Sequence, residues 1–408
     1  MRVLFLTHRL PYAPNRGDRI RAFHIVRMLA SRVELDLVSL VHDRNELDQA
    51  DSMRHLGVQV LACPVPRVRN HLKALVGLAG RRPLTHMLLN APGVAASITR
   101  LVSQRRPDVV LAYCSSMAHF AMQPPLSDIP LVLDLVDVDS GKWSALAATA
   151  SWPKRWLYAR ESRCLARFER EAATKADATL VVNERESQVI RRIAPRASIH
   201  IVPVGVDLAA VQPRSVPTEQ PHVVFCGVMN YGPNVEGVQW FAREVWPIIR
   251  ASRPDARFIV VGSSPAAAIR RLASTRRGIE VTGTVSDVRS YLWNAAVSVA
   301  PLMIAHGVQT KVLEALAAGL PVVVTSPVSG GLPHAIRAGC RLADSPQAFA
   351  QQTLALLGLS GAERRAVAAR ADVGRLNWET QLASLPTILN RAARNPVKTA
   401  AASVRSLA

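Results

Sequence analysis

The chain has 408 residues, of which 49% are apolar and 5% aromatic, and its formal net charge is +20 at pH 7. This length is too great for one hydrophobic core and predicts two domains of similar size. The apolar content excludes a disordered chain, and the low aromatic content favours an α/β protein over a β-sandwich. No apolar run reaches the roughly 18 residues that cross a bilayer, and no signal-peptide pattern is present. We therefore expect a cytoplasmic protein.

The first half of the chain alternates short strands and helices. A strand is predicted over Arg2–Thr7, a loop containing Gly17 follows, and a helix begins near Arg19. Further strands are predicted at Glu34–Val41, Val58–Cys63, Val109–Tyr113, Leu131–Val136 and Ala178–Asn183. This order is typical of a doubly wound parallel sheet, whose loops present backbone N–H groups to a ligand cleft. The dinucleotide fingerprint G-x-G-x-x-G is absent.

Positive charge is concentrated in one part of this half. No acidic residue lies between Asp51 and Asp108, whereas basic residues are frequent there: Arg54, Arg67, Arg69, Lys73, Arg81, Arg82, Arg100, Arg105 and Arg106. Within this region, residues 71–82 form a short basic amphipathic segment, which suits an anionic membrane surface. Nucleic acid is a weaker explanation, because no aromatic-interleaved basic platform or helix-turn-helix pattern is present. A generally arginine-rich composition explains the charge equally well.

Aspartates gather at the end of the predicted strand Leu131–Val136. Ligands and chemistry collect at the carboxyl ends of strands in α/β sheets, which makes Asp137 a candidate. Asp137 and Asp139 also form a D-x-D pair, a pattern that chelates metal in some enzymes, but so short a match carries little weight. The alternative is that Asp134 and Asp139 cap loops or pair with arginines. The cysteines are far apart and lack metal spacing, so we expect them to be reduced and buried.

The second half repeats the same alternation after a linker. A solvated surface helix is predicted over Lys154–Lys175, and a Pro-rich linker over residues 212–221. Strands are then predicted at His222–Gly227, Arg257–Gly262, Ile279–Thr282 and Val297–Ala300, and helices at Asn234–Arg250, Pro265–Ser274, Ser286–Asn294 and Leu356–Leu389. Strands that end in glycine let backbone approach a ligand closely. The predicted domains are residues 1–205 and 206–375, with a crossover helix and tail over 376–408.

The stretch from Gly307 to Val324 is the most informative in the chain. It predicts a helix over Lys311–Ala318, ended by Gly319 in a left-handed C-cap, and a buried strand over Val322–Val324. The first turn of a helix offers unpaired N–H groups, so a phosphate or diphosphate can bind beside Lys311. The alternative is an ordinary amphipathic helix on which Lys311 and Glu314 form a solvated pair.

This stretch resembles the signature of the retaining GT-B glycosyltransferases of group 1, the family 4-like enzymes. That signature is Glu, seven residues, Glu, then a run similar to Ala-Met-Ala-x-Gly-x-Pro-Val-Val, and Glu314 matches its second glutamate. Residues 16–21, 137–143, 225–234 and 306–311 further resemble the sugar transferases of exosortase-associated exopolysaccharide systems. The resemblance covers nearly the whole chain.

The resemblance implies two Rossmann-like domains facing across a cleft, with a C-terminal helix crossing back to the first. It also implies transfer of a hexosyl unit from a nucleoside diphosphate sugar to an acceptor hydroxyl, with retention and without metal or other cofactor. Carried onto this sequence, the catalytic residues are Asp137 and Lys311, and the substrate-binding residues are Arg16, Gly17, Gly227, Asn230, His306, Gln309, Thr310 and Glu314. The expected partners are the donor, a lipid-linked or glycan acceptor and an anionic membrane surface, with no nucleic acid. The enzyme would then be cytoplasmic, peripheral on the inner face of the cell membrane.

The sequence departs from the family pattern at three places. His306 replaces the first glutamate, which in relatives contacts the donor sugar, and Val204 replaces a common linker asparagine. Val228 and Glu236 stand where many relatives carry the arginine and lysine that bind diphosphate. Lys311 is then the main phosphate cation, with Arg16 or Arg19 as a second candidate. Two other functions stay open: a GT-B-fold epimerase acting on a UDP-sugar, and a non-catalytic protein that binds sugar nucleotides.

Overall fold

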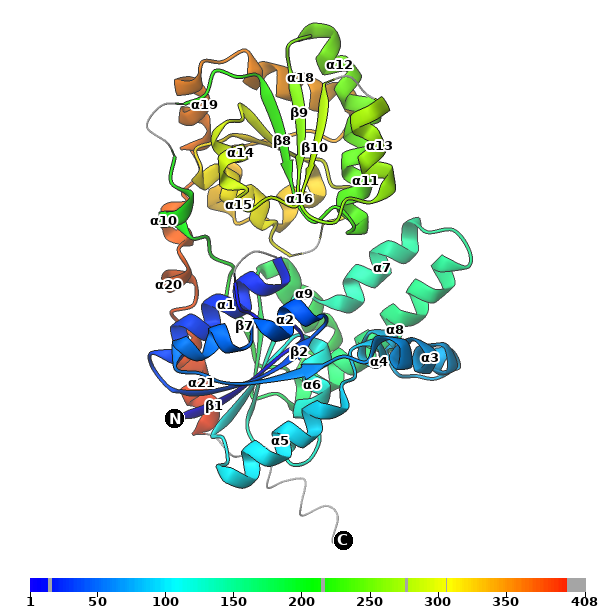
Figure 1. The fold of residues 1–408 in the computed structure, drawn as a ribbon, viewed down its shortest axis with the longest axis vertical. Coiled ribbons are helices and arrows are strands. Elements are labelled where there is room, and N and C mark those ends of the chain that lie inside the picture. The colour runs from blue at the N-terminus through cyan, green and yellow to red at the C-terminus, as the bar shows by residue number, and fades with distance from the viewer. Residues whose placement is uncertain (14–16, 214–216, 276–277, 306, 395–408) are drawn as a thin grey trace. The chain divides into compact units, whose positions relative to one another are not determined.

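The computed structural model describes residues 1–13, 17–213, 217–275, 278–305 and 307–394. The chain forms two compact units (Figure 1). Unit 1 comprises Met1–Pro203 together with the last described helix, α21 (Leu385–Ala393), and unit 2 is Val204–Thr380. The domain boundaries predicted at residues 205 and 375 lie close to these divisions and stay predictions. His306 and Arg16 lie outside the described residues.

Unit 1 is built on a seven-stranded parallel sheet of order β3-β2-β1-β4-β5-β6-β7. Its strands are β1 (Arg2–Thr7), β2 (Glu34–Val41), β3 (Gln59–Pro64), β4 (Val109–Tyr113), β5 (Leu131–Val136), β6 (Ala178–Val181) and β7 (Ile199–Ile201). Runs such as Leu35–Val41 are buried on both faces, as expected for a parallel sheet covered by helices. The helices are α1 (Gly17–Ala30), α2 (Arg44–Asp48), α3 (Arg67–Val76), α4 (Leu84–Leu88), α5 (Pro92–Gln104), α6 (Ser115–Ala121), α7 (Asp139–Thr149), α8 (Lys154–Lys175) and α9 (Glu184–Ile193), with 3-10 turns η1 (Asp51–Leu56) and η2 (Gly77–Ala79).

Unit 2 carries a six-stranded parallel sheet of order β10-β9-β8-β11-β12-β13. Its strands are β8 (His222–Cys226), β9 (Arg257–Val261), β10 (Ile279–Gly283), β11 (Val297–Ala300), β12 (Val322–Val324) and β13 (Cys340–Leu342). Its helices are α10 (Leu208–Val211), α11 (Gly232–Trp240), α12 (Trp246–Ser252), α13 (Ala267–Thr275), α14 (Arg289–Trp293), α15 (Thr310–Ala317), α16 (Ser326–Gly331), α17 (His334–Arg337), α18 (Pro346–Leu357), α19 (Gly361–Ala368) and α20 (Trp378–Gln381). In both units the strand order reverses beside the first strand, which is the switch point of a doubly wound sheet.

The helix predicted over residues 234–250 is interrupted. A π-helical segment, η3 (Phe241–Val245), separates α11 from α12. Pro247 lies in the first turn of α12 and has no N–H to donate to the preceding turn, which explains the local widening of the helix. Phe241 in this segment packs against Phe258 of β9, with ring centroids 4.6 Å apart, so the interruption faces the core of unit 2.

The prediction of one continuous helical region over residues 356–389 is also wrong. The region is divided into the end of α18, then α19, a 3-10 turn η4 (Gly374–Leu376), α20 and α21. A new N-terminus forms at Ser360, whose side chain accepts from the Glu363 N–H in a capping box. The predicted return of the terminal helix to the first domain is confirmed, because α21 packs against β4 and β5. Among the described helices, none combines the length and the apolar composition needed to traverse a bilayer.

Candidate active site

Lys311 extends from the first turn of α15 to the carboxyl end of β8. Its Nζ donates a hydrogen bond of 2.7 Å to Oδ1 of Asn234, and it lies 4.4 Å from the centroid of the Phe225 ring. Phe225 is the next-to-last residue of strand β8, and Asn234 is in the first turn of α11. The amine is therefore held at the edge where parallel sheets bind ligands, and the predicted binding of a phosphate beside it stays a prediction.

Two glycines let the chain pass close beneath this amine. A Cβ on Gly262 would lie 1.7 Å from the carbonyl oxygen of Gly227, and Gly262 has φ +151°. A Cβ on Gly227 would lie 2.8 Å from Nδ2 of Asn234 and 3.3 Å from Nζ of Lys311. Only glycine fits at these two strand ends, because a side chain would displace backbone or the lysine–asparagine pair. The close approach seen here is between segments of the chain, and the predicted close approach of a ligand stays a prediction.

Asn234 is the residue of this site that sequence reasoning missed. It is buried, and its Nδ2 donates to the Val228 carbonyl at 3.0 Å, which leaves Oδ1 to accept from Lys311. The signal in the sequence is a polar residue that follows Pro233 in the first turn of an apolar helix. The predicted neighbour Asn230 is instead exposed, in the turn after β8.

Burial shifts the protonation of the charged groups around α15. It lowers the pKa of Lys311 to about 8, a shift that Cys226 and Glu314 partly oppose. Burial likewise raises the pKa of Glu314 to about 7, and Lys311 partly opposes that shift. In the described part of the chain the two side chains form no ion pair, so the solvated-pair alternative is not what the structure shows. Both groups are poised to change charge near neutral pH when a ligand binds.

Gln309 and Thr310 begin this helix. Gln309 is the N-cap residue, with extended backbone angles, and Thr310 is the first helical residue. Gly307 just before them has φ +62°, a left-handed conformation that suits glycine. Gly319 has φ +77° after the helix, as its predicted C-cap role requires. The N–H groups of the first turn are thus presented at the same end of the helix as Lys311.

Asp137 follows β5 in unit 1, in a strained part of the backbone. Val136 has φ +62° and Cys114, after β4, has φ +70°, which is unusual for residues with a side chain. The register of β5 against β6 shifts between Asp134 and Val136. Strain of this kind collects at functional sites, where surrounding structure maintains it. Asp134 itself accepts from Arg21 at 2.8 Å and is fully buried, so for this residue the alternative of pairing with an arginine is correct.

The carboxyl group of Asp137 lies in a cluster of acidic groups. Its pKa is raised to about 7, first by burial and then by Glu186 and Asp139. The pKa of Glu169 on α8 is raised to about 8 by burial and then by Asp139, and Ser140 donates to its carboxyl through both N–H and Oγ. Glu186 accepts from the Val138 N–H at 2.7 Å. The prediction that α8 is a simple solvated helix is therefore wrong, since it buries an acid beneath the aspartates.

The arginine proposed as a second phosphate cation has another partner. Gly17 is the first residue of α1, so the helix begins two residues earlier than predicted and Gly17 is not in the loop before it. Arg19, in the first turn of that helix, forms an ion pair with Glu46 and lies 4.5 Å from the centroid of the Tyr12 ring. Arg9 also binds Glu46. Arg19 thus shares the single carboxylate of Glu46 with Arg9 within unit 1.

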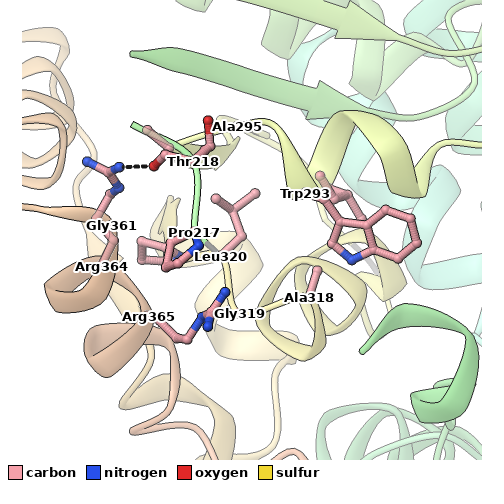
Figure 2. A pocket seen from close by; sticks show the side chains of 13 residues that line it. Pro217, Thr218, Trp293, Ala295, Ala318, Gly319, Leu320, Gly361, Arg364 and Arg365 are labelled. Carbon is pink, nitrogen blue, oxygen red and sulfur yellow. Dashed lines mark hydrogen bonds between the residues drawn. The ribbon is translucent and has the colours of Figure 1, made fainter. Parts of the chain in front are cut away.

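Neither metal-ligand clusters nor a large enclosed cavity marks the site. No group of three or more His, Cys, Asp or Glu side chains in the described residues is arranged to hold a metal ion, so the D-x-D pair has no such partners there. Figure 2 shows a pocket of unit 2 lined by residues such as Pro217, Gly319 and Arg364. Its accessible volume of ≈ 30 Å³ accommodates about one water molecule. It lies where β11 and β12 begin, away from the Lys311 amine.

Two family models match consecutive parts of this chain. The 4-like glycosyl transferase domain matches residues 17–205, and glycosyl transferases group 1 matches residues 220–358. The chain belongs to the group 1 glycosyltransferases, which use nucleotide sugars, and its first domain is of the 4-like type. The comparison with curated proteins gave no match.

Solved structures with the same fold span almost the whole chain. Sucrose-phosphate synthase from Thermosynechococcus elongatus has a TM-score of 0.72 and 16% identity, over 96% of this chain and 98% of that one. HepE from Anabaena in complex with UDP has a TM-score of 0.66 and 13% identity, over 96% and 100%. WaaG, a glycosyltransferase involved in lipopolysaccharide biosynthesis, has a TM-score of 0.64 and 17% identity, over 97% and 100%. The predicted GT-B fold is confirmed.

Proposed function

We propose that this enzyme transfers a hexosyl unit from a nucleoside diphosphate sugar to an acceptor hydroxyl, with retention of anomeric configuration and without a metal ion. The observation that carries the proposal is the position of Lys311. Its amine is fixed by Asn234 at the carboxyl edge of β8 and lies beside the open first turn of α15. A cation and unpaired N–H groups at one point favour a diphosphate there.

This arrangement stabilises the departing diphosphate. As the bond between the anomeric carbon and the phosphate oxygen breaks, negative charge grows on that oxygen. Preorganised N–H groups and the Lys311 ammonium then stabilise the transition state, which can lower a barrier by several kcal/mol. We assign Gln309 and Thr310 to the same phosphate contacts, and Glu314 to the ribose hydroxyls.

Retention without a protein nucleophile requires attack from the face of the leaving group. The acceptor oxygen forms a bond to the anomeric carbon on the face that the phosphate leaves, and the acceptor proton passes to the departing phosphate oxygen. The products are the glycoside and the nucleoside diphosphate, so charge and protons balance. Asp137, with its pKa raised to about 7, is our candidate for positioning the acceptor or the reacting sugar.

UDP-glucose is the first donor to test. HepE, which shares the fold, has been solved with UDP, with UDP and glucose, and with UDP-glucose. We further propose a role in exopolysaccharide or other cell-envelope glycan synthesis, with a lipid-linked or glycan acceptor. The resemblance of residues 16–21, 137–143, 225–234 and 306–311 to that subgroup supports it. The enzyme would work in the cytoplasm, peripherally attached to the inner face of the membrane.

A ligand screen followed by a turnover assay tests this function. UDP, GDP, ADP, dTDP and their sugars are compared by thermal shift, and a ligand at 100 times its Kd should stabilise the native state by about 2.7 kcal/mol. The stabilising sugar nucleotide is then incubated with and without a glycan acceptor. Acceptor-dependent release of the nucleoside diphosphate with an α-to-α or β-to-β product supports the proposal. Conversion of the donor sugar without acceptor would instead identify an epimerase, and binding without turnover a binding protein.

A further inference from the structure

Helix α3 (Arg67–Val76) places its apolar side chains toward solvent. Val68, Leu72, Leu75 and Val76 are 78%, 61%, 64% and 86% exposed. Their spacing of four, three and one residues puts them on one side of the helix. A surface helix normally turns such a stripe toward the core, so the pattern of α3 is inverted and calls for a partner outside the unit.

The opposite side of α3 is the one that packs on unit 1, and its contacts are fixed. Asn70 and Ala74 are its buried residues. Asn70 donates to the carbonyls of Leu88 and Asn90 at 2.9 and 2.7 Å. These two hydrogen bonds set the rotation of the helix, because turning the apolar stripe inward would break both of them. The outward stripe is therefore a built feature of the fold.

Two tryptophans from another helix extend this apolar surface. Trp152 and Trp156 are 81% and 51% exposed, just before and in the first turn of α8. One turn after Trp156, the buried Arg160 donates to the carbonyls of Leu78 and Gly80 at 2.7 and 2.6 Å. Residues four apart share a helix face, so Trp156 points along the side of α8 that holds the end of α3. Arg160 thus ties α8 to the turn that follows α3.

The charge around this surface has one sign. Residues 67–82 and 141–160 contain no Asp or Glu. The exposed basic residues around the apolar side chains are Arg67, Arg69, Lys73, Arg81, Arg82, Lys154 and Arg155. Apolar side chains and tryptophans within a ring of cations suit an interface that is apolar below and anionic at its surface.

We propose that the α3–α8 surface, defined as residues 67–82 of the α3 region with 152–156 of the start of α8, docks on the headgroup region of a bilayer containing anionic lipid. The tryptophans and the α3 stripe enter the interface, while the lysines and arginines contact the anionic headgroups. A second copy of the chain is disfavoured at this surface, because it would bring two cationic rings together. Nucleic acid offers no apolar layer for Val68, Leu72, Leu75 and Val76. The proposal names the surface for the peripheral membrane attachment that is part of the proposed function, and it does not depend on which sugar is transferred.

Vesicle flotation of the full chain tests the electrostatic part. The probes are phosphatidylcholine vesicles with and without phosphatidylglycerol, at low and high salt. Each basic residue at an anionic surface contributes about fivefold in binding, so Arg67→Gln/Lys73→Gln should bind anionic vesicles roughly thirtyfold more weakly. The matched control Arg100→Gln/Arg370→Gln also removes two exposed cations, but neither is part of the α3–α8 surface, so it should lose much less. Equal losses in the two variants would overturn the proposal, since net charge alone would then explain binding.

A second set of variants tests the apolar part. Leu75→Ser/Val76→Ser should lose most vesicle binding, whereas Leu342→Ser, which changes a leucine 56% exposed in unit 2, should bind like wild type. Bromine-labelled lipids should quench wild-type fluorescence, and Trp152→Phe/Trp156→Phe should lose that quenching. Failure of wild type to float, unchanged binding by Leu75→Ser/Val76→Ser, or self-association that this variant abolishes would each refute membrane docking. Nucleotide binding is measured on the same samples, so failure here is distinguishable from failure of the proposed function.

Discussion

Replacing Lys311 with methionine is the sharpest test of the diphosphate site. The substitution keeps much of the side-chain length but removes the amine, with its 2.7 Å hydrogen bond to Asn234 and its charge. Hydrogen bonds to charged groups contribute about 1.5–3 kcal/mol, so we expect UDP to bind roughly 10- to 150-fold more weakly. Loss of a charge-stabilising donor typically lowers kcat by a further 100- to 1000-fold. Calorimetry with UDP and a turnover assay measure the two effects separately.

The pH dependence adds a control that is internal to the site. The pKa of Lys311 is lowered to about 8 by burial, so the free enzyme carries the ammonium below that pH and loses it above. UDP affinity of the wild type should therefore fall as the pH rises through about 8, and that component should vanish in Lys311→Met. Lys175→Met, at an exposed lysine that pairs with Glu171, should change neither quantity. Unchanged UDP affinity in Lys311→Met, or the same pH slope as wild type, would refute the assignment.

Three further substitutions probe other parts of the two units. Asp137→Asn should lower kcat strongly while UDP affinity stays within about twofold. The pH profile of the wild-type rate should show a titration near pH 7 that is absent from the profile of the variant. Glu169→Gln should flatten the pH dependence of the free energy of unfolding measured with urea. The pKa of Glu169 in the folded protein is about 8, above its ordinary value of 4.5, so the folded state binds a proton that the unfolded state releases. The stability of the wild type therefore falls as the pH rises between these two values, by about 1 kcal/mol per pH unit. Gly262→Ala should lose more than about 2 kcal/mol of stability, because its Cβ would meet the Gly227 carbonyl at 1.7 Å, whereas Gly232→Ala, with open space around it, should be nearly neutral.

The regular parts of the fold were predictable because their signals are local. Val/Leu runs bounded by glycine mark the parallel strands, and Gly319 with Pro321 marks the end of α15, which the structure places at Ala317 rather than Ala318. The start of α15 beside Lys311 could be predicted because the helix signals and the lysine are adjacent in sequence, while the phosphate role of Lys311 stays a prediction. Its hydrogen-bond partner Asn234 lies 77 positions away in the chain, so no local pattern could identify that contact.

Buried charge was the part that sequence patterns could not reach. A helix rich in Arg and Glu, such as α8, has no period that separates its solvated residues from its buried ones. Glu169 is fully buried, and Ser140 at the start of α7, almost thirty residues away, donates a hydrogen bond to its carboxyl group. Arg160 is buried for the same kind of reason, since its partners are backbone carbonyls of the turn after α3. Such interactions arise from tertiary packing, so no local pattern in the sequence predicts them.

The departures from the family pattern also acquire a physical meaning in unit 2. Val228 contributes its backbone carbonyl to Asn234, and Glu236 is exposed, so neither supplies the positive charge implied for its position. In the described residues, the side chains that oppose the lowering of the Lys311 pKa are the Cys226 thiol and the Glu314 carboxyl, and neither is basic. A diphosphate bound at this site as proposed would be balanced by Lys311 together with the N–H groups of the first turn of α15. A single lysine with a pKa near 8 makes donor binding more sensitive to alkaline pH than a site with an arginine, whose charge persists.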